Sequence, residues 1–184
     1  MKTLLLLPLF LLSQLLLPVH AAETGEVNST FTGDYRLDTG DKIRIQVYNE
    51  DDLYLEARVN DSGIISYPFL GNIQVVGLTP SQLEQEIARK LKGDYLIDPK
   101  VSVDIMEYRQ FYVNGEVQSP GGYPFQPGIT VRKAISVAGG FKERASRDKV
   151  FLIREGINND EPAKVSLDDR ILPGDIITVE ESFF

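Results

Sequence analysis

The sequence predicts an α+β protein made of two small strand-rich units, each with one helix packed on a sheet. Short runs in which aliphatic and polar residues alternate recur along the chain. Two segments carry helix-start signals followed by aliphatic residues at helical spacing. A chain of 184 residues with 42% hydrophobic and 25% charged residues has an ordinary globular composition, so one domain or two small ones are expected.

The first unit is expected over residues 34–106 in a β-β-β-α-β order. Aliphatic and polar residues alternate at 42–47 and again at 101–105, which is the period of a half-buried strand. The polar segment 60–63 separates 57–59 from 64–67 in a hairpin-like pattern, and 73–76 are a further short strand.

A helix is expected to begin at Thr79. Thr79 can cap it, Pro80 takes the first helical position, and Gln82 completes a capping box. Gly93 can end the helix. The aliphatic residues on its inner face are Leu83, Ile87 and Leu91.

The second unit is expected over residues 107–184. Strands are predicted at 111–113, 115–117, 150–154 and 176–179, with a polar loop over 155–164. Thr130 can cap a short helix that stops at Gly139-Gly140.

Gly-Asp turns precede the first and the last predicted strand, with aliphatic residues two and four positions after each Asp. This repeated pattern suggests that the same kind of turn leads into both strands. The residues interpreted as backbone turn devices are Gly40, Asp41, Gly63, Gly71, Pro120, Gly121, Gly139, Gly140, Gly174 and Asp175.

Residues 1–21 are predicted to be a secretory signal peptide. Lys2 precedes a Leu-rich stretch too short for a membrane span, and small residues precede a cleavage site after Ala21. Residues 22–33 would form a flexible lead-in. Because no Cys follows the apolar stretch, we expect an exported periplasmic protein that is not a lipoprotein and that associates with the outer membrane at most peripherally.

The composition narrows the possible chemistry. The chain has no Cys, and its single His, His20, lies in the predicted leader. This removes Ser-His-Asp and Cys-His sites and the usual zinc and iron–sulfur ligand sets from the mature chain. A formal net charge of −8 disfavours nucleic acid as a partner. We therefore expect no catalytic residues, no metal and no cofactor.

Acidic clusters leave carboxylate chemistry as an alternative. They occur at 50–52, 160–161 and 168–169, and could be a glycosidase pair or a calcium site. None shows the alternating pattern of a calcium loop, so solvated loop charge is the favoured interpretation.

Two further groups are candidates for contact with a glycan or a neighbouring subunit. Aromatic residues surround the unit junction, and strand packing is the alternative interpretation. A basic patch follows Gly140, where a solvated loop is the alternative. The candidate contact residues are Tyr108, Arg109, Tyr112, Tyr123, Lys142, Arg144 and Arg147.

The chain resembles the polysaccharide biosynthesis/export proteins. The resemblance to their polysaccharide-export domain lies in Tyr35–Ile43, in the Asp61–Gly71 segment DSGIISYPFLG, in Gly77–Leu83 and in Tyr95–Val103. The segments GEVQSPG at 115–121, AISVAGGF at 134–141 and LPGDIITV at 172–179 resemble a soluble-ligand-binding β-grasp (SLBB) domain. Coverage runs from about 34 to 182.

This resemblance implies a non-enzymatic periplasmic component of a capsule or exopolysaccharide translocon, with polysaccharide as its cargo. It implies a homo-oligomeric ring, an inner-membrane co-polymerase as partner and a separate outer-membrane β-barrel. Larger family members have a lipidated N-terminal Cys, a second β-grasp repeat and a C-terminal pore helix, which this sequence lacks. The alternatives are a monomeric periplasmic carbohydrate- or ligand-binding module and a carboxylate-based glycosidase.

Overall fold

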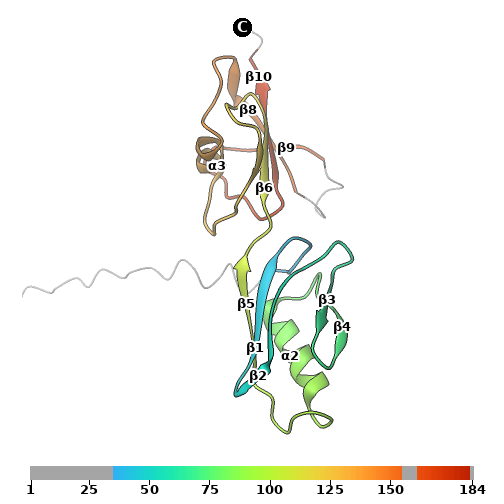
Figure 1. The fold of residues 1–184 in the computed structure, drawn as a ribbon. Helices are drawn as coiled ribbons and strands as arrows, with labels where there is room; N and C mark the ends of the chain where they lie inside the picture. Colours follow the sequence, from blue (N-terminus) through green and yellow to red (C-terminus); the bar gives the residue numbers. More distant parts are fainter. Residues whose placement is uncertain (1–34, 155–160, 183–184) are drawn as a thin grey trace, which may run out of the picture.

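The computed structural model describes residues 35–154 and 161–182, which form two units placed end to end (Figure 1). Each unit has its own hydrophobic core, one built around Ile43, Leu83 and Ile87 and the other around Phe111, Ile135 and Ile177. The predicted signal peptide (1–21) and lead-in (22–33) lie outside the described residues. The domain boundary at 106/107 stays a prediction.

The first unit is centred on a three-stranded sheet in the order β2-β1-β5. Its strands are β1 (Lys42–Val47), β2 (Glu50–Arg58) and β5 (Val101–Glu107), and β1 pairs antiparallel with both neighbours. Alternate residues of β1 are fully buried, as its pattern predicts. β2 is longer than the predicted 57–59. Its second half pairs with β1 from Leu55 to Arg58, and its acidic first half pairs with β1 through Glu50 while Asp51 and Asp52 remain exposed.

The predicted hairpin around residues 60–63 is wrong. β3 (Ile64–Tyr67) pairs with β4 (Gly71–Gln74), whereas β2 pairs with β1. The Asn60 side chain accepts hydrogen bonds from the backbone N–H groups of Ser62 and Ile64, and the Gly63 carbonyl accepts from the N–H of Val75. These bonds turn the chain away from β2 and toward β4. β4 also begins earlier, at Gly71, than the strand predicted at 73–76.

Helix α2 (Pro80–Leu91) is confirmed with its capping box. The Thr79 hydroxyl accepts from the N–H of Gln82 at 3.2 Å, and the Gln82 side chain accepts from the N–H of Thr79 at 2.9 Å. Gly93 follows the helix with a φ of +96°. The three predicted aliphatic residues are fully buried against the sheet, so α2 covers one face of β2-β1-β5.

The second unit is a five-stranded mixed sheet in the order β7-β6-β10-β8-β9. Its strands are β6 (Phe111–Gly115), β7 (Gly121–Tyr123), β8 (Ala145–Ile153), β9 (Ala163–Lys164) and β10 (Ile176–Glu181). β10 runs parallel to β6 and antiparallel to β8. β7 was not predicted, and β8 extends five residues before the predicted start at 150, so Arg147 and Lys149 lie on a strand and not in a loop.

Helix α3 (Val131–Val137) begins at Thr130, whose side chain accepts from the N–H of Lys133. It packs on the mixed sheet through Val131, Ala134 and Ile135. Each unit therefore has one helix on a sheet, and the predicted α+β class with two strand-rich units is confirmed.

Tyr67 makes the first core sensitive to alkaline pH. Its ring is 2% exposed, its hydroxyl donates to the Leu53 carbonyl at 2.8 Å, and burial raises the pKa of Tyr67 to about 12. The unfolded chain loses this proton at a lower pH than the folded chain, so stability present below about pH 10 is lost as pH rises toward 12. We expect the free energy of unfolding, measured with urea at several pH values, to fall over this range. The fall with pH should be less steep for Tyr67→Phe, which has no phenol proton to lose. An equal dependence of the free energy of unfolding on pH in the wild type and in Tyr67→Phe would contradict this role of Tyr67.

Candidate functional site at the junction of the two units

The turn before β1 holds a buried carboxylate. Asp41 is 0% exposed and follows Gly40, which has a φ of +91°. Its Oδ2 accepts from the Asp38 N–H at 2.9 Å and from the Tyr35 hydroxyl at 2.7 Å. The Asp41 N–H donates to the Asp38 carbonyl at 3.2 Å, so the turn is closed by backbone and side chain together.

The turn before β10 has the same construction. Gly174 has a φ of +88°, and Asp175 is 1% exposed. The Asp175 Oδ2 accepts from the Leu172 N–H at 2.7 Å, and the Asp175 N–H donates to the Leu172 carbonyl at 3.2 Å. Arg154 at the end of β8 donates to both carboxylate oxygens, at 2.8 and 2.6 Å. Among the described residues, Asp41 and Asp175 are the buried charged side chains.

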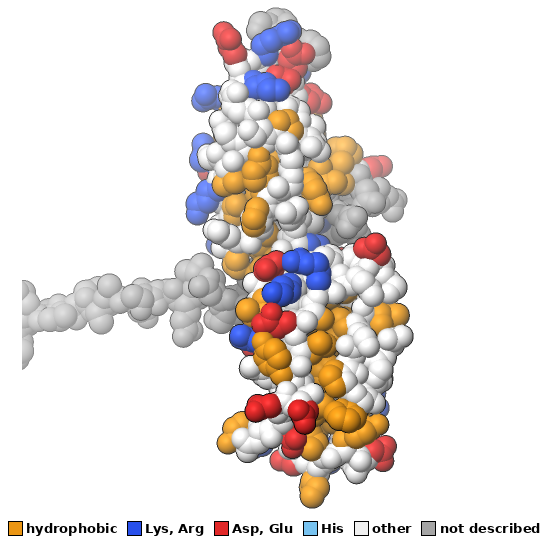
Figure 2. All heavy atoms as spheres, viewed as in Figure 1, with side chains coloured by type: hydrophobic (Ala, Val, Ile, Leu, Met, Phe, Trp, Pro, Cys, Tyr) orange, Lys and Arg blue, Asp and Glu red, His pale blue; other side chains and the backbone are white. Residues whose placement is uncertain are grey.

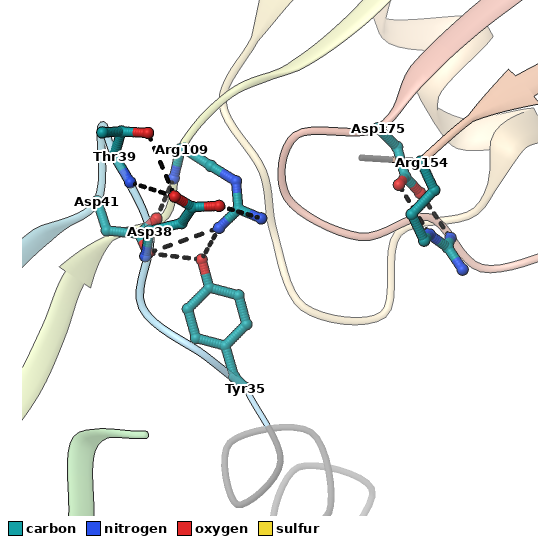
Figure 3. A network of polar contacts seen from close by, with 7 residues as sticks. All are labelled: Tyr35, Asp38, Thr39, Asp41, Arg109, Arg154 and Asp175. Carbon is teal, nitrogen blue, oxygen red and sulfur yellow. Dashed lines mark hydrogen bonds and ion pairs between the residues drawn. The ribbon is translucent and has the colours of Figure 1, made fainter. Parts of the chain in front are cut away.

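Arg109 links the first turn to the second unit (Figure 3). Its backbone N–H donates to Asp41 Oδ1 at 2.8 Å, and its Nη1 donates to the Tyr35 hydroxyl at 2.7 Å. Its guanidinium also lies 3.5 Å from Asp38 and 3.7 Å from Asp41. The positive charge of Arg109 therefore offsets the free-energy cost of burying the negatively charged Asp41 carboxylate.

Both Gly-Asp turns lie so close to Arg109 that a side chain added to either glycine would press against it. A Cβ on Gly40 would lie 3.3 Å from the Arg109 Cβ, and a Cβ on Gly174 would lie 2.8 Å from its Nε. The Gly174 N–H also donates to the carbonyl of Gln110, next to Arg109. The two glycines thus allow one arginine to contact a turn from each unit.

Aromatic rings join the two cores beside this polar network. Tyr108 makes edge-to-face contacts with Tyr35, at a centroid distance of 5.1 Å, and with Phe125, at 5.4 Å. Tyr108 packs against both hydrophobic cores. Because only residues 108–110 connect β5 to β6, one short segment carries both the aromatic and the ionic contact between units.

Burial is the largest cause of the pKa shifts of Asp41 and Tyr35 in this network. Burial raises the pKa of Asp41, while hydrogen bonds from Tyr35 and from the Asp38 and Arg109 N–H groups, and the Arg109 charge, act in the opposite direction. Burial, with the nearby Asp41 carboxylate, raises the pKa of Tyr35 well above its usual range. The Tyr35 hydroxyl therefore stays protonated and keeps donating to Asp41.

A groove of about 840 Å³ lies along the junction. Of the predicted contact residues, Tyr108, Arg109 and Tyr112 line it, and the Tyr112 ring is 45% exposed. The wall also includes Met106 and Phe125, together with Arg58 and the amides of Gln110 and Gln126. Aromatic faces beside planar amides and a guanidinium can bind a hydroxylated ligand.

The other predicted contact residues lie elsewhere. Tyr123 stacks on Phe111 and donates to the Ser119 carbonyl. Arg144 pairs with Glu181 at 2.5 Å, and Arg147 lies over the Phe141 ring at 5.6 Å. Lys142 lies in the segment leading into β8, and its backbone N–H donates to the backbone carbonyl of Glu116. The structure therefore does not bring this second group to the groove.

Sequence reasoning did not assign a role to Tyr35, Asp38 or Arg58. The repeated Gly-Asp pair was the available signal for the turn, but the partners of its carboxylate come from distant positions. Of the acidic clusters, residues 50–52 lie on β2, and Asp160 lies outside the described residues. Among the described residues, no three His, Cys, Asp or Glu side chains are grouped to hold a metal ion.

Comparison with known proteins identifies the family. The profile of the polysaccharide biosynthesis/export proteins matches residues 29–106, and that of the SLBB domain matches residues 110–164. The chain belongs to the polysaccharide biosynthesis/export protein family. The two matches meet at the 108–110 segment, where Tyr108 and Arg109 join the units.

Three curated proteins illustrate the similarity. The exopolysaccharide production protein ExoF of Rhizobium meliloti (strain 1021) is 36% identical over 149 residues, covering 74% of this chain and 35% of that protein. The EPS I polysaccharide export outer membrane protein EpsA of Ralstonia solanacearum is 29% identical over 132 residues, covering 58% and 35%. The polysialic acid transport protein KpsD of Escherichia coli is 26% identical over 146 residues, covering 78% and 26%. The chain thus spans about a third of these relatives or less.

Neither α2 nor α3 has the length and apolar character that crossing a bilayer requires, and the same holds for every helix among the described residues.

Proposed function

We propose that the chain is a non-enzymatic periplasmic component of a machine that exports a capsule or exopolysaccharide. The observation that carries this proposal is the ordered pair of family matches over two consecutive folded units. Relatives named for exopolysaccharide production, polysaccharide export and polysialic acid transport support it. Shape and assembly, and not bond cleavage, would be the basis of its action.

The component would work as a ring of identical copies. A single chain of this size cannot enclose a polymer channel, whereas head-to-tail contacts between the two units of adjacent copies could close one. The short 108–110 connection, held by Arg109 and Tyr108, would set the angle between units that such closure needs. An inner-membrane co-polymerase would supply the driving force, and a separate outer-membrane pore would release the polymer.

The junction groove is the proposed place of contact with the polymer or with a neighbouring copy, through Tyr108, Arg109 and Tyr112. A second contact region on the second unit, away from this groove, would be formed by Lys142, Arg144 and Arg147. Tyr123, which pairs with Phe111 at the other end of the sheet, would be a separate contact.

Deleting the gene in the producing cell tests the proposal. We expect the polysaccharide outside the cell to fall to a small fraction of its normal amount, with restoration by the wild-type chain. Purified chain mixed with that polysaccharide should create no new reducing ends. Normal export in the deletion strain would contradict the proposed function, and new reducing ends would favour a glycosidase.

A monomeric ligand-binding module is the second candidate, and the groove of about 840 Å³ is the observation that favours it. Light scattering after size exclusion separates the two. Higher oligomers, alone or with envelope partners, are expected for the ring, whereas a strict monomer at high concentration would favour the binding module.

A further inference from the structure

One face of the β2-β1-β5 sheet is left open by the described elements. The residues of β1 that point toward α2 are Ile43, Ile45 and Val47, and all are buried. The alternate residues point to the opposite face, which we call the open sheet face. It is formed by Lys42, Arg44, Gln46, Tyr54, Glu56, Arg58, Ser102, Asp104 and Glu107.

The charges on the open sheet face are paired with one another across the strands. Lys42 lies 3.1 Å from Glu56, Arg44 lies 3.2 Å from Asp104, and Arg58 lies 2.5 Å from Glu107. Three cations meet three anions, so the face offers many hydrogen-bonding groups without a net charge. Figure 2 shows basic and acidic side chains interspersed on the first unit. Such a surface neither traps nor repels a charged polymer at long range.

Exposed apolar side chains lie at both ends of this face. At the end near the β1–β2 turn, Tyr48 and Tyr54 are 71% and 46% exposed and line a hollow of about 420 Å³. At the other end, Met106 and Tyr112 are 42% and 45% exposed and line the junction groove. Ser102 belongs to the first hollow, and Arg58 and Glu107 belong to the groove, so the open sheet face connects the two.

We propose that the open sheet face, with the hollow at each end, is the surface along which the exported sugar polymer is held. This inference rests on the proposed function. Tyrosine rings stack on the apolar C–H faces of sugar rings, and the paired charges between them donate and accept hydrogen bonds with sugar hydroxyls. Because the pairs cancel, the contact is with uncharged stretches of the polymer, and each contact is weak enough for the polymer to advance.

Cysteine labelling tests this placement, because the chain contains no Cys and a single introduced thiol is unique. Ser102→Cys places the thiol on the open sheet face, and Ser81→Cys places a matched control on the exposed side of α2. Reaction with a small maleimide is compared in cells that make the polymer and in cells whose polymerising step is disabled. We expect Ser102→Cys to react at least about threefold more slowly when polymer is made, and Ser81→Cys to be unchanged.

The outcomes separate the alternatives. Equal rates for Ser102→Cys in the two cells would overturn the placement, whether both are fast because the face is empty or both slow because another protein covers it. Equal slowing of Ser81→Cys would also overturn it, since protection would not be local. If gene deletion blocks export but Ser102→Cys reacts equally, only this inference fails. If deletion leaves export normal, the proposed function itself fails.

A second pair of variants measures the aromatic contribution. Tyr48→Ala and Tyr95→Ala each remove an exposed tyrosine from the first unit, but Tyr95 lies outside both hollows. Binding of the full chain to polymer purified from the producing cell should weaken about two- to tenfold for Tyr48→Ala and stay unchanged for Tyr95→Ala. Equal binding by both variants would contradict the stacking role.

Discussion

Gly115→Ala is expected to destabilise the second unit by at least about 3 kcal/mol. Gly115 ends β6 with a φ of +82° and pairs with Val179 of the parallel strand β10. A Cβ at this position would overlap the Val179 carbonyl oxygen, which already accepts a hydrogen bond from the Glu116 N–H at 2.9 Å. Since the obstacle is backbone in the centre of the sheet, β6 and β10 would have to separate.

Gly128→Ala is the matched control for this prediction. Gly128 has the same φ of +82°, but nothing lies within 4 Å of its added Cβ. It should therefore cost only the backbone strain, about 1 kcal/mol. Urea unfolding followed by circular dichroism measures both losses, and amide exchange assigns them to β6 and β10. Equal losses in the two variants would show that overlap with Val179 is not the cause.

Asp41→Asn is the second substitution with a large expected effect: we expect it to lower the free energy of unfolding by about 3 kcal/mol. Oδ2 of Asp41 accepts from the Tyr35 hydroxyl and the Asp38 N–H, and Oδ1 accepts from the Arg109 N–H. Whichever way an asparagine amide is oriented, its NH₂ group faces a donor. The substitution also removes the buried negative charge opposite the Arg109 guanidinium, which lies 3.7 Å away.

Asp38→Asn is its control in the same turn. Asp38 also lies within ion-pair distance of Arg109, at 3.5 Å, but its side chain is 33% exposed. Asp38→Asn should therefore lower the free energy of unfolding by about 1 kcal/mol or less. We also expect small-angle scattering to show a broader range of distances between the two units for Asp41→Asn alone. The prediction fails if the two variants unfold at the same urea concentration and scatter alike.

The local patterns of the sequence predicted the helices and most strands, because their signals lie within a few residues. Thr79 and Gln82 form the capping box that their spacing indicates. The pairing of β3 was missed because the side-chain bonds of Asn60 redirect the chain, and a turn signal does not reveal which strand follows as partner. β2 was underestimated because its exposed half is acidic, and acidic residues are uncommon in strands.

The junction could be predicted only in part. Tyr108, Arg109 and Tyr112 stood out as aromatic and basic residues between the units, and they line the groove. Arg109 lies 68 residues after Asp41 and a similar distance before Gly174, so no local pattern of the sequence shows that it is close to both Gly-Asp turns. The open sheet face was also beyond prediction, because the pairing of its charges depends on the registers of β2 and β5 with β1.

The central claim is that the chain acts on the passage of a sugar polymer and not on its synthesis or cleavage. The most direct measurement is to label the polymer with a radioactive sugar in cells lacking the gene and to follow its location and length. Polymer of normal length that accumulates inside the outer membrane, and appears outside when the chain is restored, is the predicted result. Labelled polymer reaching the medium at the normal rate, or failing to form at all, would contradict the claim.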